Sequence, residues 1–148
     1  MQTLREQLGT GDKRRQVIED AMNVLDQEVG DKGGLGGLAI KAAYKVVKGI
    51  RPGFIREVVD GLLDEFLDAV EPLYQEAVSK QRPAGSGVKE NPGRVAEGLL
   101  AVTDKKSEKA KSQVVRSAYE KLRPSAKKQV EAACPRLAGL LERHARAA

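Results

Sequence analysis

At 148 residues, the chain suits one domain that can bury a stable core. Its apolar residues are mostly Ala, Val and Leu, and only five residues are aromatic, which favours helices over strands. No apolar run reaches the roughly 18–20 residues that span a bilayer, and we expect no secretory signal in the polar residues 1–6. Because the lone Cys134 cannot form an internal disulfide, we expect a reducing compartment and a cytoplasmic protein.

The net charge of +5 is distributed unevenly along the chain. Residues 1–78 carry 10 basic and 14 acidic side chains, a net of −4, whereas residues 94–148 carry 13 and 6, a net of +7. In the interpretation that we favour, the two halves pack together and partly neutralise each other. In the alternative, the basic half binds nucleic acid, anionic lipid or an acidic protein.

Apolar residues at three- and four-residue steps predict three helices in the N-terminal half, over residues 13–29, 35–50 and 54–78. Asp12 is the expected N-cap of the first helix, and Gly30 is its expected stop. The segment Arg51-Pro52-Gly53 breaks the pattern between the second and third. Pro72 lies inside the third helix, where it should kink or restart it, because proline lacks the backbone donor.

Residues 79–93 are polar, rich in Gly and Pro and aperiodic, which is typical of a flexible internal linker. Three shorter helices are predicted after it, over residues 92–102, 104–122 and 124–146. Asn91 and Thr103 are the expected caps of the first two of these. The chain therefore predicts an all-α fold: a compact bundle of about six helices in a single domain over residues 1–148.

The charges predict how the two central helices pack. If helices 35–50 and 54–78 fold back on each other at the Arg51–Phe54 turn, three Lys/Asp pairs fall into register: Lys48 with Asp60, Lys45 with Asp64 and Lys41 with Asp68. We therefore expect an αα-hairpin with a ladder of ion pairs along one seam. Each exposed pair contributes only about 0–1 kcal/mol, so facing apolar side chains must hold the hairpin.

Two motifs in the N-terminal half resemble binding sites. Gly34, Gly36 and Ala39 form a G-x-G-x-x-A string, but a dinucleotide-binding turn must follow a strand, and here a helix ends before it. We expect a flexible connection there; an anion site at the helix start near Lys41 is a weaker alternative. The acidic stripe Asp60, Asp64, Asp68 and Glu71 runs along one helix and does not converge, so we expect no metal site.

The chain offers few groups for nucleophilic catalysis or for soft metals. Cys134 and His144 are the single cysteine and histidine, and ten residues of straight helix would hold them about 15 Å apart. A Cys–His pair needs about 3 Å, so we expect no dyad, no zinc site and no cofactor. Cys134 is expected to pack as a small apolar residue.

Basic residues in the C-terminal half form a possible surface for an anionic partner: Lys105, Lys106, Lys109, Lys111, Arg116, Lys127 and Lys128. They spread around their helices, and Tyr119, the one aromatic among them, lies on the apolar face, so no base-stacking platform is predicted. The helix over 35–50, with its lysines and wide apolar face, could also lie on an anionic membrane. We place both alternatives second, because the apolar face is needed for the core.

The chain resembles an uncharacterised family of small bacterial proteins. The resemblance rests on Glu28-Val29, Lys32–Lys41 and the Ile50–Gly53 turn, and further on Leu99–Asp104, Ala118–Arg123 and Val130–Leu137. It covers most of the chain outside the linker and implies a bacterial, cytoplasmic, helical protein. It brings no activity, ligand or catalytic residue.

From these features we expect a non-enzymatic interaction or scaffold protein that binds a protein partner or itself. A binder of nucleic acid or acidic lipid, acting through residues 104–128, is the first alternative. A carrier of a small apolar ligand is the second. An enclosed apolar cavity with a few inward polar groups, such as Tyr44 or Tyr119, would favour the carrier.

Overall fold

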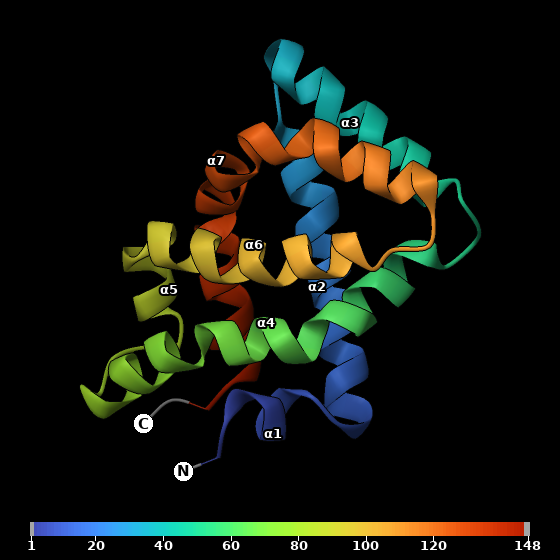
Figure 1. Cartoon of the computed structure of the whole chain (residues 1–148). Helices are drawn as coiled ribbons and strands as arrows, with labels where there is room; N and C mark the ends of the chain where they lie inside the picture. The colour runs from blue at the N-terminus through green and yellow to red at the C-terminus, as the bar shows by residue number, and fades with distance from the viewer. Residues whose placement is uncertain (1, 147–148) are drawn as a thin grey trace.

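The structure is a computed structural model that describes residues 2–146, except the side chains of residues 34–36. The described residues form seven helices and no strand, which confirms the predicted all-α bundle (Figure 1). The helices are α1 (Leu4–Leu8), α2 (Gly11–Asp31), α3 (Gly34–Lys48), α4 (Phe54–Ser79), α5 (Ser86–Glu90), α6 (Pro92–Glu108) and α7 (Gln113–His144).

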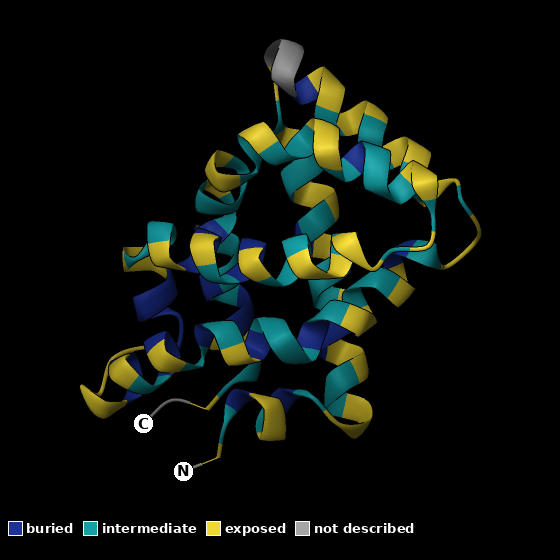
Figure 2. Ribbon diagram, viewed as in Figure 1, coloured by how far each residue is buried: buried dark blue, intermediate teal, exposed yellow. Residues whose placement is uncertain are grey.

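The core lies where α4, α5, α6 and α7 meet α1 and α2 (Figure 2). Its largest fully buried side chain is Tyr74 of α4, which is 1% exposed. The Tyr74 hydroxyl accepts a hydrogen bond from Gln7 Nε2 and donates one to the Arg146 carbonyl, both at 2.8 Å. This buried hydroxyl therefore ties the two ends of the chain together, in agreement with their positions in Figure 1.

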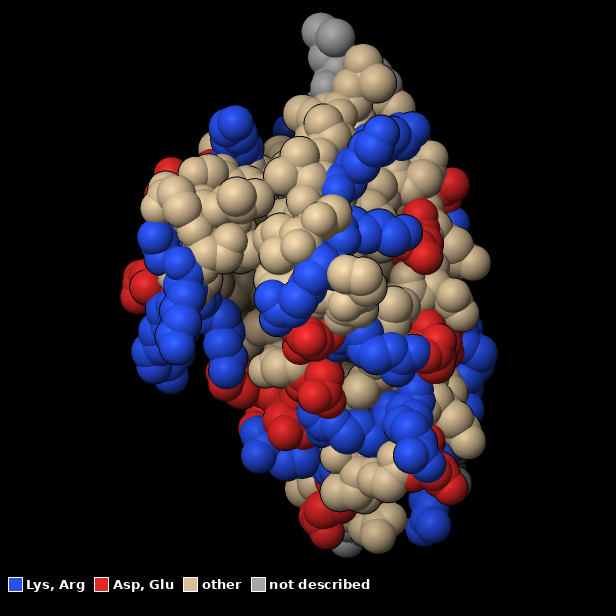
Figure 3. All heavy atoms as spheres, turned by 90° about the vertical axis from the view of Figure 1, so that its right-hand side faces the viewer, with Lys and Arg blue, Asp and Glu red and all other residues tan. Residues whose placement is uncertain are grey.

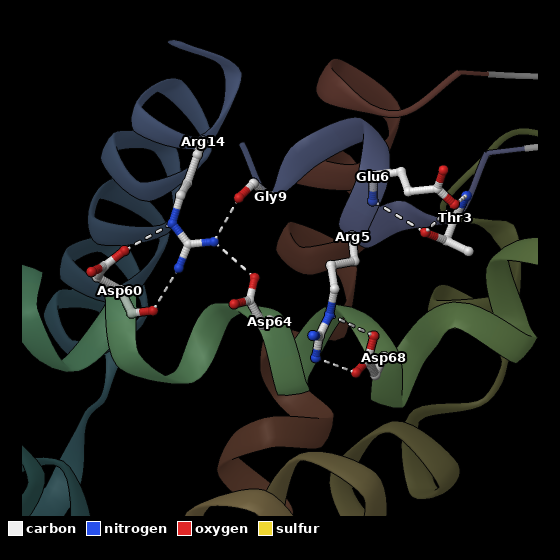
Figure 4. Close-up of polar contacts among 8 residues, drawn as sticks. All are labelled: Thr3, Arg5, Glu6, Gly9, Arg14, Asp60, Asp64 and Asp68. Atoms are coloured by element: carbon white, nitrogen blue, oxygen red, sulfur yellow. Dashed lines mark hydrogen bonds and ion pairs between the residues drawn. The ribbon is translucent and has the colours of Figure 1, made fainter. Parts of the chain in front are cut away.

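The acidic stripe of α4 binds the N-terminal helices (Figure 4). Arg14 of α2 donates to Asp60 Oδ1 (2.9 Å), to Asp64 Oδ1 (2.8 Å) and to the carbonyls of Gly9 and Asp60. Arg5 of α1 donates to both carboxylate oxygens of Asp68. Among the described residues no group of acids gathers as a metal site would require. The stripe is thus an ion-pair surface, but its partners are arginines and not the predicted lysines.

We expect Arg14→Ala to lower the free energy of unfolding by about 1–2 kcal/mol, because Arg14 is only 21% exposed and makes four hydrogen bonds between elements. Arg15→Ala is the matched control, since Arg15 is exposed and pairs only with Asp12 one helical turn away. Urea denaturation of both variants measures the difference. Equal losses would show that the Arg14 contacts do not stabilise the fold.

The predicted αα-hairpin is wrong. Beyond the turn at residues 49–53, α3 leaves α4 and lies along the first half of α7 (Figure 1). The Tyr44 hydroxyl donates to Asp26 Oδ1 of α2 at 2.5 Å, which fixes the other side of α3. The expected ladder is absent, and arginines pair with the three acids instead: Arg5 binds Asp68 through two nitrogens, and Arg14 bridges Asp60 and Asp64.

The prediction of a flexible linker over residues 79–93 is also wrong for residues 84–90. This stretch forms the buried turn before α5 and then α5 itself, where Ala84 and Val88 join the core between α4 and α7. The glycines there allow close approach of backbones. A Cβ on Gly87 would lie 2.5 Å from the Leu73 carbonyl oxygen, and one on Gly85 would collide with the Ala138 backbone.

The helix limits in the C-terminal half differ from the prediction. The start of α6 at Pro92 is confirmed, but α6 continues to Glu108, so Thr103 lies inside it and its hydroxyl donates to the Leu100 carbonyl. α7 runs through Pro124 and Pro135 as one helix and changes direction along its length (Figure 1). Prolines bend a helix where they remove its hydrogen bonds, and the bend lets α7 contact both α3 and the core.

Candidate ligand cavity

An apolar cavity of about 380 Å³ lies inside the bundle, between α2, α4, α6 and α7, with Ile40 of α3 at one side. Most of its wall consists of aliphatic side chains and one phenylalanine, and Glu28, Lys32, Thr103 and Gln129 also line it. The apolar residues include Val24, Val59, Leu62, Phe66, Leu99 and Leu137. Such a size and lining are typical of pockets for small apolar ligands, which measure roughly 300–1,000 Å³.

The cavity leaves the inner face of α4 incompletely covered. Val59, Leu62 and Phe66 continue the apolar stripe that buries Leu63 and Leu67, yet all three are only half-buried. Large apolar side chains on the inner face of a bundle are normally closed off by their neighbours, since each Å² left open costs about 25 cal/mol. The neighbours here stand back from α4, so the bundle leaves apolar surface that a ligand can cover.

An outer pocket of about 600 Å³ adjoins the cavity. Val58, Leu62 and Thr103 line both, and we call this shared boundary the neck. The outer pocket lies between the start of α4, the end of α6 and the start of α7. It is lined by the basic Arg51, Lys106 and Lys111 and by the acidic Glu57, which pairs with Arg51. The whole hollow therefore has an apolar interior and a polar, basic opening.

A hydroxyl network forms the polar side of the neck. The Tyr119 hydroxyl donates to Asp104 Oδ1 at 2.5 Å and lies 2.6 Å from the Thr103 hydroxyl. Arg123 binds Asp104 through two nitrogens and lowers its pKa, while burial and the Asp104 carboxylate raise the pKa of Tyr119. Tyr119 thus remains a neutral donor at physiological pH. Tyr44, the other tyrosine named from the sequence, points to Asp26 instead.

The opposite wall of the cavity holds a half-buried ion pair. Glu28 accepts a bond from Lys32 Nζ (3.0 Å) and one from Arg136 Nη1 (2.5 Å), and both Glu28 and Lys32 line the cavity. Arg136 also binds Asp31. Because these charges satisfy one another, they close the wall and do not offer a free ion to a ligand.

The seven predicted basic residues lie on α6, on α7 and on the segment between them. Lys106 pairs with Glu65, Lys127 pairs with Glu97, and Arg116 donates to the Ala110 carbonyl. Lys106 and Lys111 meet at the outer pocket, whereas Lys105, Lys109 and Lys128 are exposed elsewhere on α6, α7 and the segment between them. Nothing in the sequence indicated the hollow beside Lys106 and Lys111, because it forms only where the end of α6 and the start of α4 come together.

The remaining candidate groups make structural contacts, although His144 Nδ1 is buried without a hydrogen-bond partner among the described residues. The Cys134 thiol is buried and donates to the Val130 carbonyl; burial, with Glu131 and Glu28 nearby, raises its pKa to about 11. His144 Nε2 lies 2.8 Å from Asp20 Oδ2, which also binds Arg143. The Gly34–Ala39 string opens α3 and follows α2, so no strand precedes it, as the sequence predicts.

The ion pair of Asp20 should make the free energy of unfolding depend on pH. Arg143 chiefly, and then His144, lower the pKa of Asp20 below its ordinary 3.8. A depressed carboxyl pKa adds stability above the ordinary value, and this stability is lost as pH falls through the lower folded-state value. Asp20→Asn should therefore cost about 1–2 kcal/mol at neutral pH and almost nothing below the folded-state pKa. Urea denaturation at neutral and acid pH measures the difference; a constant loss would contradict the assignment, and exposed Asp12→Asn is the control.

A family model covers nearly the whole helical chain, from residue 4 to residue 145. The chain belongs to the family of unknown function DUF6918. This confirms the expected membership of an uncharacterised family. No curated protein and no solved structure matches this DUF6918 chain. No helix in the described part of the DUF6918 chain is long and apolar enough to cross a membrane.

Proposed function

We propose that the protein binds a small amphiphile, a molecule with one apolar chain and an anionic head, and carries it inside the bundle. The observation that supports this most strongly is the apolar cavity of about 380 Å³, lined by the half-buried Val59, Leu62 and Phe66. An apolar tail in this cavity removes their exposed surface from water, which is the main source of binding free energy for such ligands.

The outer pocket accounts for the anionic head. Lys111 lies on its rim, and no acidic side chain in the described residues pairs with it. Ser112 lines the same pocket, and its hydroxyl, which accepts from the Val115 amide, keeps its hydrogen for a ligand; the Tyr119 hydroxyl already donates to Asp104. A carboxylate or phosphate at the end of an apolar chain can therefore lie among donors while its chain passes the neck at Leu62.

Calorimetric titration with octanoate, laurate and palmitate tests the proposal. We expect affinity to rise with chain length, by about 0.8 kcal/mol per buried methylene, until the cavity is full. Palmityl alcohol is the matched ligand for the head group, and we expect it to bind more weakly than palmitate. Lack of binding by every member of the series would refute the proposal.

The interaction or scaffold role expected from the sequence stays a prediction. It is supported by Leu38, Val46 and Val114, which are the exposed large apolar residues of the described chain. We give the carrier role priority because a cavity with a polar opening is more specific than an exposed apolar strip. The proposal includes a non-enzymatic role, since Cys134 and His144 have structural partners. A cytoplasmic location, which the lone Cys134 favours, is also part of it.

A further inference from the structure

The fold brings two basic segments together. Residues 32–56 contain six basic and no acidic residues, and residues 109–128 contain seven basic residues and one acidic residue. These segments include α3 and the first half of α7, which lie side by side (Figure 1). We call them together the basic layer. It carries a net charge of +12 (13 basic, 1 acidic), whereas the other residues carry −7 (13 basic, 20 acidic).

The lysines of the basic layer are mostly free to bind an external anion. Seven of them form no ion pair with any residue that the structure describes: Lys41, Lys45, Lys48, Lys109, Lys111, Lys121 and Lys128. In Figure 3, basic and uncharged side chains make up most of the upper part of the face, and acidic side chains are more numerous in its lower half. The layer is thus a strongly positive end of a molecule whose remainder is negative.

An apolar strip runs through the basic layer. Leu38 and Val46 of α3 are 64% and 55% exposed, and Val114 of α7 is 45% exposed. By helical geometry, Leu38, Ala42 and Val46 share one side of α3, while Lys41, Lys45 and Lys48 lie beside them. A shallow groove between α3 and α7, lined by Ala42, Val46 and Val114, continues the strip. The expectation that the apolar face of α3 is needed for the core is therefore wrong for Leu38 and Val46.

We propose that the basic layer docks on the surface of an anionic membrane, with Leu38, Val46 and Val114 in the headgroup region and the lysines on acidic lipid headgroups. Lysines beside exposed aliphatic side chains on one helix face are the pattern of interfacial helices. Nucleic acid explains the lysines but not the exposed aliphatic strip, and the described part of the layer presents no stack of aromatic side chains. The inference does not rest on the carrier function, because docking needs no ligand in the cavity.

Flotation of the full chain with vesicles tests the proposal. We expect binding to phosphatidylcholine vesicles that contain phosphatidylglycerol, no binding to phosphatidylcholine alone, and weaker binding at raised salt. The variant Lys41→Gln/Lys45→Gln/Lys48→Gln should lose roughly a hundredfold in affinity, since each lysine contributes about fivefold. Lys80→Gln/Lys89→Gln, exposed lysines outside the layer, is the matched control and should bind like the wild type.

Leu38→Ser/Val46→Ser separates a membrane from other anionic or apolar partners. We expect it to weaken vesicle binding about tenfold or more, because both side chains are exposed in the free protein and should enter the headgroup region. Three results would overturn the proposal: no flotation, tighter binding to duplex DNA that this variant leaves unchanged, or a dimer in light scattering that this variant dissociates. Circular dichroism of each variant confirms that the helices are intact.

Discussion

Replacing Gly87 by alanine is expected to lower the free energy of unfolding by about 2–3 kcal/mol, a large effect for the addition of one methyl group. The new Cβ would lie 2.5 Å from the carbonyl oxygen of Leu73 and 3.1 Å from its Cβ. Neither atom is the end of a flexible side chain, so α4 or α5 must shift. Urea denaturation measures the loss.

Gly61→Ala is the matched control for Gly87→Ala. Gly61 lies within α4, where an added Cβ meets nothing within 4 Å, so alanine should stabilise that helix by up to about 1 kcal/mol. The two substitutions are chemically identical and should have effects of opposite sign. If Gly87→Ala were neutral, α5 would not pack as the structure shows, and residues 79–93 would behave as the linker that their composition indicates.

The variant Ala133→Phe is expected to abolish binding of palmitate, with a loss of affinity of about a hundredfold, while the protein remains as stable as the wild type within about 1 kcal/mol. Ala133 lines the cavity, so a phenyl ring can enter space that the ligand would otherwise occupy. The ring also covers apolar wall that is open in the free protein, which offsets the strain of the larger side chain. Titration calorimetry and urea denaturation measure the two quantities.

Ala77→Phe serves as the control for Ala133→Phe. Ala77 is 3% exposed in the packed part of the core and does not line the cavity, so the same added volume should cost about 3 kcal/mol or more there. An equal loss of stability in both variants would mean that the cavity is closed in solution. Unchanged palmitate affinity in Ala133→Phe would mean that the ligand binds elsewhere.

The helical periodicity of the sequence was sufficient to predict most of the secondary structure. We expected three helices in the N-terminal half of the chain, and they correspond to α2, α3 and α4, because their apolar residues follow the helical repeat. The break before α4 was also predictable, since Gly53 has a φ of +78°, which few residues other than glycine adopt. The limits near Thr103 and Pro124 were wrong, because packing against the core overrides the local signals of a cap or a proline.

Helix pairing was harder to predict. The lysines of α3 and the acids of α4 fall into register in the sequence, but Arg5 and Arg14, far earlier in the chain, bind those acids instead. Charge patterns cannot rank such alternatives, since each exposed pair contributes so little. Likewise, a packed segment whose glycines permit close contact, such as Gly85 and Gly87, has the same composition as a flexible linker. Only the close approach of other backbones in the structure distinguishes the packed segment from a linker.

The sequence allowed an apolar cavity as one alternative but did not show where it would lie. Its walls come from five helices, and each wall residue fits the apolar stripe of a normal core, so no single segment indicates a hollow. The wide apolar face of α3 was no signal for it, because its exposed residues Leu38 and Val46 do not line the cavity. The basic residues near Lys111 gave no indication of the cavity either.

Methyl-resolved NMR during titration with palmitate tests the carrier function most directly. Bound ligand should shift the methyl signals of Val59, Leu62 and Leu137, which line the cavity, and leave those of the distant, buried Leu8 unchanged. Shifts confined to Leu38, Val46 and Val114 on the outer strip, or no shifts at all, would contradict it.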